Sequence, residues 1–146
     1  MKMDDKDKII IEMLMKNARI SLAEIAEALK ISDVAVSKRI KKLEENGIIK
    51  GYTAIVNHIK LGYSSAAIVG IDVEPERLLE VSRLLKEKNY VRYLALTTGD
   101  HMLILQVLSR NNYDLTNILK DIASTSGVKS VRPAIVLDTI KGILDG

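Results

Sequence analysis

The sequence contains no Cys, no Trp and no Phe, and its aromatic residues are five Tyr. The lack of cysteine excludes disulfides and thiolate chemistry. Without Phe and Trp, a packed core has to be built largely from aliphatic side chains. No apolar run approaches the ~20 residues of a membrane span, and Asp4, Asp5 and Asp7 interrupt any signal-peptide pattern. We therefore expect a soluble, cytoplasmic protein with no membrane partner.

Residues for catalysis and for metal binding are equally scarce. His58 and His101 are the two histidines, and His58 is expected to be a surface residue. The sequence has no recognisable Ser/His/Asp set and no Gly-rich phosphate loop. The ligands of a zinc site are also missing. We therefore predict that the protein is not an enzyme and that it binds neither a cofactor nor a metal.

Positive charge is concentrated in one short segment. The net charge of the chain is a modest +3, but positions 37–42 carry four basic residues and no acidic one. A local positive field of this kind suits contact with nucleic acid more than a uniformly basic chain would.

Residues 21–49 have the pattern of two helices joined by a tight turn. Ser21 and Glu24 are spaced as a capping box, which starts a helix. Apolar residues then recur at helical spacing, at Leu22, Ile25, Ala26 and Leu29. Ser32 can cap the second helix. Lys30 occupies the turn position where Gly is usual, so a left-handed Lys costs about 1 kcal/mol there.

The second helix has an apolar stripe formed by Val36, Ile40 and Leu43, with basic and hydroxyl side chains largely off that stripe. This arrangement favours a helix-turn-helix whose second helix enters the major groove of double-stranded DNA. The residues predicted to face the groove are at its N-terminal end: Ser32, Asp33, Val34, Ala35, Ser37 and Lys38. Those predicted to hold phosphates are Arg39, Lys41, Lys42 and Lys50. An ordinary antiparallel helix pair with a solvated basic face is the alternative.

Two further elements complete the predicted N-terminal domain, residues 1–57. A first helix is expected from Asp5 to Lys16, and Gly47 suits the left-handed position after the second helix of the pair. Ile48–Asn57 has the composition of a strand. Three helices followed by a strand predict a winged helix-turn-helix. Residues 58–63 are expected to form a hinge.

Residues 64–146 change to a pattern of strands and helices. Apolar, β-rich segments predict four strands, at Ser65–Val73, Tyr90–Thr98, Met102–Leu108 and Val128–Ile140. Helices are predicted after Pro75 and after Asn111, which gives the order βαββαβ of a ferredoxin-like fold. The overall class is α+β. Because the strands are apolar in nearly continuous runs, we expect both sheet faces to be buried and the protein to be at least a dimer.

The segment Thr97–Met102 (TTGDHM) lies between two predicted strands and is the candidate small-molecule site. A plain hairpin turn explains the same residues, because Gly and Asp are common at turns. The residue chemistry alone leaves both interpretations open.

The chain resembles the Lrp/AsnC family of transcription regulators, also called feast/famine regulatory proteins. The resemblance spans nearly all of the sequence. It is carried by DDKDKIIIEML, SLAEIAEALKIS, VAVSKRIKKLEENGIIKGYTAIVN, the Leu61–Tyr63 segment, TTGDHM and the closing GVKSVRPAIVLDTIKG. The stretch RIKKLEENGIIKGYTA is the most specific to the family. It implies a winged helix-turn-helix joined to an ACT-like regulatory domain that binds amino acids. It also implies dimers that often assemble into octamers.

The same resemblance implies where an amino-acid effector would bind. The corresponding residues here are Thr98, Gly99, Asp100, His101, Met102, Ile135 and Val136. Met102 stands where family members often carry an Asp, which removes a partner for the α-ammonium group and favours a small apolar amino acid. It also favours an alternative, an architectural DNA-binding protein without an effector. A third alternative is an enzyme of amino-acid metabolism, or an allosteric subunit, that uses the C-terminal domain.

Overall fold

The computed structural model describes residues 1–142 and divides into two compact units, Met1–Ala54 and Ile55–Gly146. The division falls three residues before the predicted end of the N-terminal domain. No helix in the described part of the chain is long and apolar enough to cross a membrane.

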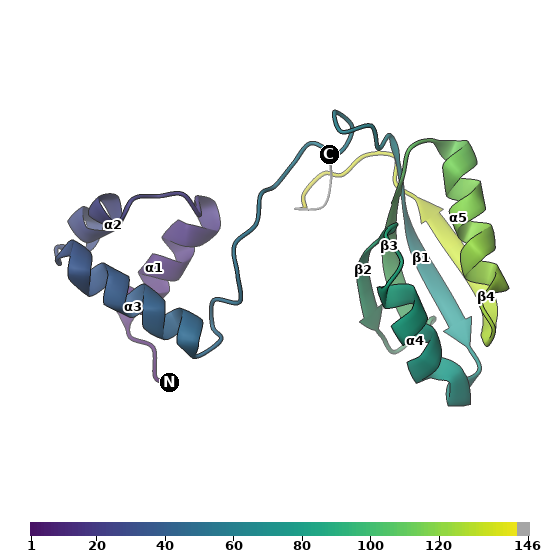
Figure 1. The fold of residues 1–146 in the computed structure, drawn as a ribbon, viewed down its shortest axis with the longest axis horizontal. Coiled ribbons are helices and arrows are strands. Elements are labelled where there is room, and N and C mark those ends of the chain that lie inside the picture. The colour runs from purple at the N-terminus through teal and green to yellow at the C-terminus, as the bar shows by residue number, and fades with distance from the viewer. Residues whose placement is uncertain (143–146) are drawn as a thin grey trace. The chain divides into compact units, whose positions relative to one another are not determined.

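The N-terminal unit consists of three helices, α1 (Asp5–Lys16), α2 (Leu22–Leu29) and α3 (Asp33–Glu45), as Figure 1 shows. All three lie where the sequence predicts them. Their apolar stripes meet in one aliphatic core, whose buried members are Ile10, Ile25, Ala26, Val36 and Leu43. Ile40 is partly buried against this core, so the predicted apolar stripe of α3 is confirmed.

Side-chain caps begin each of these helices. The Ser21 hydroxyl accepts a hydrogen bond from the N–H of Glu24 at 3.1 Å, which is one half of the predicted capping box. Ser32 caps α3 as expected. A complete capping box begins α1 instead: the N–H of Asp7 donates to Asp4, and the N–H of Asp4 donates to Asp7. The sequence analysis did not identify this pair of carboxylates.

Lys30 ends α2 in the left-handed conformation, with φ 55° and ψ 45°, as predicted. Among the described non-glycine residues it is the one with positive φ. Gly47 follows α3 with φ 71°, also as predicted.

The predicted strand at Ile48–Asn57 is wrong, because the structure contains no strand in this segment. Tyr52 and Ile55, two residues of strand-forming type in this segment, are 52% and 68% exposed. A strand is stabilised by hydrogen bonds to a neighbouring strand, and no described segment pairs with this one. Strand-forming composition was therefore insufficient to make a strand here.

The C-terminal unit is an antiparallel sheet with the strand order β2-β3-β1-β4. The strands are β1 (Ser65–Val73), β2 (Val91–Leu96), β3 (Leu103–Ser109) and β4 (Val128–Ile135), and the helices are α4 (Leu78–Lys86) and α5 (Asn112–Ser124). A short 3₁₀ turn, η1 (Pro75–Arg77), precedes α4. Figure 1 shows both helices on one face of the sheet. The βαββαβ order confirms the predicted ferredoxin-like fold, although β2 and β4 are shorter than predicted.

Alternate residues of the central strands fill the core beneath the helices. From β1 and β3 these are Ala67, Val69, Ile71, Val73, Leu103, Leu105 and Val107. From α4 and α5 they are Val81, Leu85, Leu115, Ile118 and Ile122. Pro133 lies in β4, an edge strand, where its missing N–H costs no hydrogen bond of a central ladder. The sheet therefore has one face closed by helices.

The other face of the sheet is open, and it is partly apolar. Ile68 of β1 and Tyr93 of β2 are 47% and 53% exposed. Gly70 of β1 is buried, because the imidazole of His101 lies directly over its Cα. A β-carbon at position 70 would overlap the imidazole ring. Glycine is needed at this position for close packing.

We expect Gly70→Ala to lower the free energy of unfolding by about 1–3 kcal/mol, because the added methyl group has to displace the His101 ring. The additional change His101→Ala should recover part of this loss by removing the ring. Denaturant unfolding of the single and double variants measures both effects. Gly51→Ala is the control, because a β-carbon there meets no atom within 4 Å. Equal stabilities of the two alanine variants would contradict the packing argument.

Candidate functional site

Helix α3 presents a polar, basic face to solvent. Ser37, Lys38, Lys41 and Lys42 are exposed, whereas Val36 and Leu43 on the opposite side are fully buried. The buried residues anchor the helix to α1 and α2, so the exposed side chains project from a packed scaffold. Rigid support of this kind is what a groove-binding helix requires.

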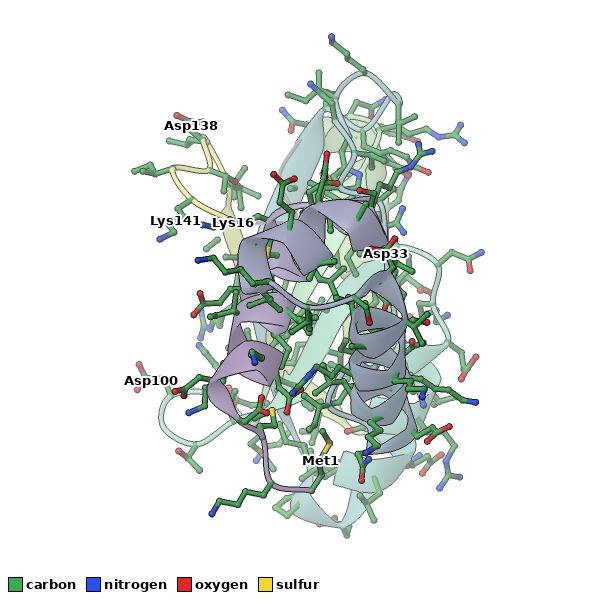
Figure 2. All side chains as sticks on the ribbon, turned by 90° about the vertical axis from the view of Figure 1, so that its left-hand side faces the viewer. Met1, Lys16, Asp33, Asp100, Asp138 and Lys141 are labelled. Carbon is green, nitrogen blue, oxygen red and sulfur yellow. The ribbon has the colours of Figure 1, made fainter. Side chains whose placement is uncertain are left out.

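The N-terminal end of α3 is open to solvent. Ser32 holds the first turn by accepting a hydrogen bond from the N–H of Ala35 at 3.1 Å. Asp33 lies at the beginning of the helix in Figure 2, and the side chain of Val34 is 63% exposed. Ala35 is half-buried. An exposed apolar side chain at this end is suited to contact a thymine methyl group.

Arg39 does not lie free on the basic face as the sequence predicted. Its guanidinium contacts the carboxylates of Asp4 and Asp7 at the start of α1, with N–O distances of 2.8–2.9 Å. Nζ of Lys41 lies 3.9 Å from Oε1 of Glu45, and both side chains are exposed. Lys50 is exposed in the segment that follows α3. The structure thus separates Arg39 from the other predicted phosphate ligands.

A groove of about 450 Å³ lies between the N-terminal residues and α3. Its lining is largely charged: Met1, Lys2, Asp4, Asp7, Ala35, Lys38, Arg39 and Lys42. The predicted DNA-binding face and the capping box of α1 therefore border the same groove.

The predicted effector turn connects β2 and β3. Thr98, Gly99 and Asp100 are exposed, and Figure 2 shows Asp100 on this loop. Gly99 has a φ of 100°, a conformation that favours glycine. Met102 packs partly against the core of the C-terminal unit. Met102, the residue that stands where family members often carry Asp, therefore belongs partly to the core.

Asp72 of β1 is a residue at this turn that the sequence analysis missed. One carboxylate oxygen lies 3.2 Å from Nδ1 of His101 and accepts a hydrogen bond from Ser130 at 3.0 Å. The other oxygen accepts a hydrogen bond from the N–H of Met102 at 3.3 Å. These hydrogen bonds, that of His101 foremost, hold the pKa of Asp72 below its usual value. Asp72 could have been found from the sequence, because it is an acidic residue within the apolar run that forms β1.

Ile135 and Val136 do not lie with this turn in a single chain. Ile135 pairs with Ala67 in the sheet, whereas the N–H of Met102 bonds to the carbonyl of Ile71. The two positions are four residues apart along β1, which is about 13 Å in a strand. The residues predicted for effector binding thus form two groups at opposite ends of β1.

Val136 lines a separate small pocket of about 130 Å³ together with His58 and Tyr63. His58, expected on the surface, is half-buried, and its Nδ1 has no hydrogen-bond partner among the described residues.

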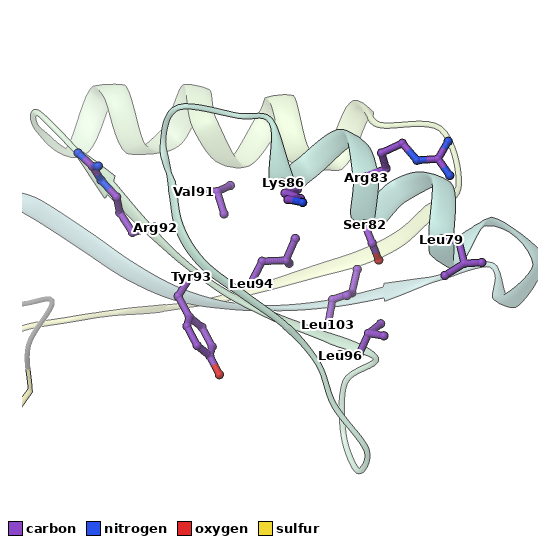
Figure 3. A pocket seen from close by; sticks show the side chains of 10 residues that line it. All are labelled: Leu79, Ser82, Arg83, Lys86, Val91, Arg92, Tyr93, Leu94, Leu96 and Leu103. Carbon is purple, nitrogen blue, oxygen red and sulfur yellow. The ribbon is translucent and has the colours of Figure 1, made fainter. Parts of the chain in front are cut away.

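A larger groove of about 610 Å³ lies between α4 and β2. Figure 3 shows Val91, Leu94 and Leu103 pointing toward the helix side of the sheet, whereas Tyr93 points away from it. Basic side chains of Arg83, Lys86 and Arg92 are also part of its lining. None of the residues predicted for effector binding lines this groove.

Comparison with known proteins agrees with this arrangement. The family described as winged helix-turn-helix DNA-binding matches residues 3–50, and the Lrp/AsnC ligand binding domain matches residues 66–142. The winged class is therefore confirmed, although the predicted strand after α3 is absent from the described chain.

Full-length relatives extend over both units. The HTH-type transcriptional regulator LrpA of Pyrococcus horikoshii is 49% identical over 139 residues, which cover 94% of this chain and 99% of the relative. LrpA of Pyrococcus abyssi is 48% identical with the same coverage. The structure of AsnC from E. coli matches with a TM-score of 0.90 at 27% identity, covering 97% of both chains.

These relatives are transcription regulators and not enzymes, which excludes the enzyme alternative and the ordinary helix pair. The match continues through both units, so it does not depend on the helix-turn-helix alone. The chain belongs to the Lrp/AsnC family of DNA-binding transcription regulators, with a ligand-binding C-terminal domain.

Proposed function

We propose that this protein regulates transcription by binding specific DNA sites through α3. The observation that carries the proposal is the exposed N-terminal end and basic face of a helix whose opposite side is fully buried. Asp33, Val34, Ser37 and Lys38 contact base edges in the major groove. Ser32 and Ala35 complete this surface at the start of the helix.

Lys41, Lys42 and Lys50 contact phosphates on either side of the groove. Their side chains are exposed, and phosphate contacts position a protein on DNA without selecting its sequence. Affinity should therefore depend steeply on salt concentration.

We expect Lys38→Ala to reduce discrimination between specific and scrambled DNA by about 1–3 kcal/mol, because a base contact is lost. Lys120→Ala removes an equal charge from α5 of the other unit and serves as the control. Fluorescence anisotropy with a duplex selected by the wild-type protein from random-sequence DNA measures both variants. A Lys38→Ala protein that keeps full discrimination would remove Lys38 from base contact.

We further propose that the C-terminal domain responds to a small apolar amino acid bound near the turn Thr98–Met102. Backbone amides around Gly99 would hold the α-carboxylate. Asp100 in the turn, and Asp72 beside it, would accept hydrogen bonds from the ammonium group. Ile135 and Val136 take part in the same site if a second chain supplies them, because one chain holds them at the far end of β1. Met102 favours an apolar over a charged effector.

An effector-independent architectural DNA-binding protein is the second candidate. The observation that favours it is the partly buried Met102 at the position where a carboxylate would be expected. Calorimetric titration with all twenty amino acids distinguishes the two candidates. We expect binding of leucine or methionine and none of lysine or glutamate. Tight binding of a charged amino acid would contradict the proposed specificity, and no binding at all would support the architectural candidate.

We also propose that the protein forms a homodimer through the open face of its sheet, and that dimers assemble further, up to an octamer. Ile68 and Tyr93 leave apolar area exposed on that face, and exposed apolar patches commonly mark interfaces. Burial of the second face would also explain why β1 and β3 are apolar almost throughout.

We expect Ile68→Asp to weaken self-association strongly, because it places a charge in the proposed interface. Lys120→Asp, on an exposed position of α5, is the control for a new carboxylate away from that face. Light scattering of the full-length protein at micromolar concentration measures the assembly. A monomeric wild-type protein would contradict the proposal directly, as would an Ile68→Asp protein that associates normally.

A further inference from the structure

One cluster of charged side chains joins the beginning of α1 to the middle of α3. We name it the Arg39 cluster, and its members are Asp4, Asp7 and Arg39. Nη1 of Arg39 donates to both carboxylate oxygens of Asp4, at 2.9 and 2.8 Å, and to Oδ1 of Asp7 at 2.9 Å. The two aspartates are the same residues that cap α1 through each other's backbone N–H groups. The cluster therefore ties the cap of one helix to the side of the DNA-binding helix.

Because Asp7 and Arg39 are largely buried, Arg39 cannot easily leave the carboxylates for a DNA phosphate. The side chain of Asp7 is 6% exposed and that of Arg39 is 29% exposed. A carboxylate that is removed from water is strongly destabilised unless a cation and hydrogen bonds compensate for the lost hydration. If Arg39 turned outward to contact a phosphate, Asp7 would lose that compensation.

Two members of the cluster, Asp4 and Arg39, stay charged at neutral pH. The N–H of Asp7, and next the guanidinium of Arg39, hold the pKa of Asp4 below its usual value. Hydrogen bonds to Asp4 and Asp7 raise the pKa of Arg39. The ionic contact between α1 and α3 is thus present under the conditions in which DNA would bind.

The position of the cluster connects it to the DNA-binding face. Lys38 and Lys42 border the same groove as Asp4 and Asp7. Two carboxylates beside these lysines would repel DNA phosphates, and the guanidinium of Arg39 offsets part of their charge. Arg39 contacts the start of α1 and is the neighbour of Lys38 along α3.

We propose that Arg39 is a positioning residue for DNA binding and not a phosphate ligand. It holds α3 against the start of α1 through Asp4 and Asp7 and so orients the helix face that meets DNA. This inference rests on the proposed contact of α3 with DNA.

The sign of the effect of removing an acidic residue provides the first test. By charge alone, Asp4→Asn and Asp7→Asn should strengthen binding to DNA, because each removes a negative charge from a DNA-binding surface. The proposal predicts the opposite: both variants weaken binding by about threefold or more, since they release Arg39 and α3. Asp5→Asn is the matched control, because Asp5 lies in the same turn, is exposed and does not contact Arg39. It should bind DNA as well as or slightly better than the wild type.

Salt dependence provides the second test, because it distinguishes a positioning role of Arg39 from a direct contact with phosphate. Arg39→Gln should lower affinity while changing the slope of log affinity against log salt clearly less than the loss of a phosphate ligand does. Lys42→Gln, the matched control for a phosphate ligand, should reduce that slope by about one unit. Combining Arg39→Gln with Asp7→Asn should cost less than the sum of the two single changes, because both break the same contact. The probe is a duplex selected from random-sequence DNA by the wild-type protein.

Folding is checked by circular dichroism, and affinities are compared below the first unfolding transition of every variant. Asp4→Asn keeps the test valid if Asp7→Asn fails to fold, because the Asp4 side chain is 55% exposed. The proposal is overturned if Asp4→Asn binds like Asp5→Asn, or if Arg39→Gln reduces the salt slope as Lys42→Gln does. A wild-type protein that does not bind DNA would instead overturn the proposed function.

Discussion

Burial of aliphatic side chains in two separate cores is the constraint on which the rest of this structure depends. With no Phe, no Trp and no Cys, aliphatic side chains supply most of the packing and no disulfide can reinforce it. The C-terminal core is formed by Ala, Val, Leu and Ile side chains from β1, β3, α4 and α5. The N-terminal core has five buried residues from three short helices. Further apolar side chains are partly buried against these five, and polar contacts at the helix ends add to the packing.

Charged groups supply those contacts where the aliphatic core ends. Asp7 of α1 is almost fully buried and Asp72 is partly buried in the sheet, and each lies beside a nitrogen-bearing side chain, Arg39 or His101. Hydrogen bonds depend on both distance and angle, whereas apolar contacts do not. These charged groups therefore restrict the relative orientation of the elements that they join. In the N-terminal unit the result is a fixed orientation of α3. At the β2–β3 turn the result is a His101 ring that covers Gly70.

Local sequence signals predicted most of the elements. Helical spacing located α1, and spacing together with side-chain caps located α2 and α3. Lys30 was recognised as a left-handed residue because its turn position usually requires Gly. The strand order along the chain was also predictable, since β-rich apolar runs alternate with amphipathic segments. The strand at Ile48–Asn57 was wrongly predicted, because a strand depends on a partner that composition does not reveal. The limits of β2 and β4 were overestimated for the same reason, since both are edge strands with a neighbour on one side only.

The sequence by itself determined which residues are apolar, where the basic segment lies and which family the chain resembles, since these properties follow from residue order. Only the tertiary structure decided which charges are free. Arg39 and Lys38 are adjacent in the basic segment, yet α1 approaches one flank of α3 and brings Asp4 and Asp7 to Arg39 alone. It likewise decided that Asp72 meets the turn at His101 and that Ile135 lies at the far end of β1. Such pairings join residues distant along the chain, and they arise from how helices and strands pack, which a local pattern does not contain.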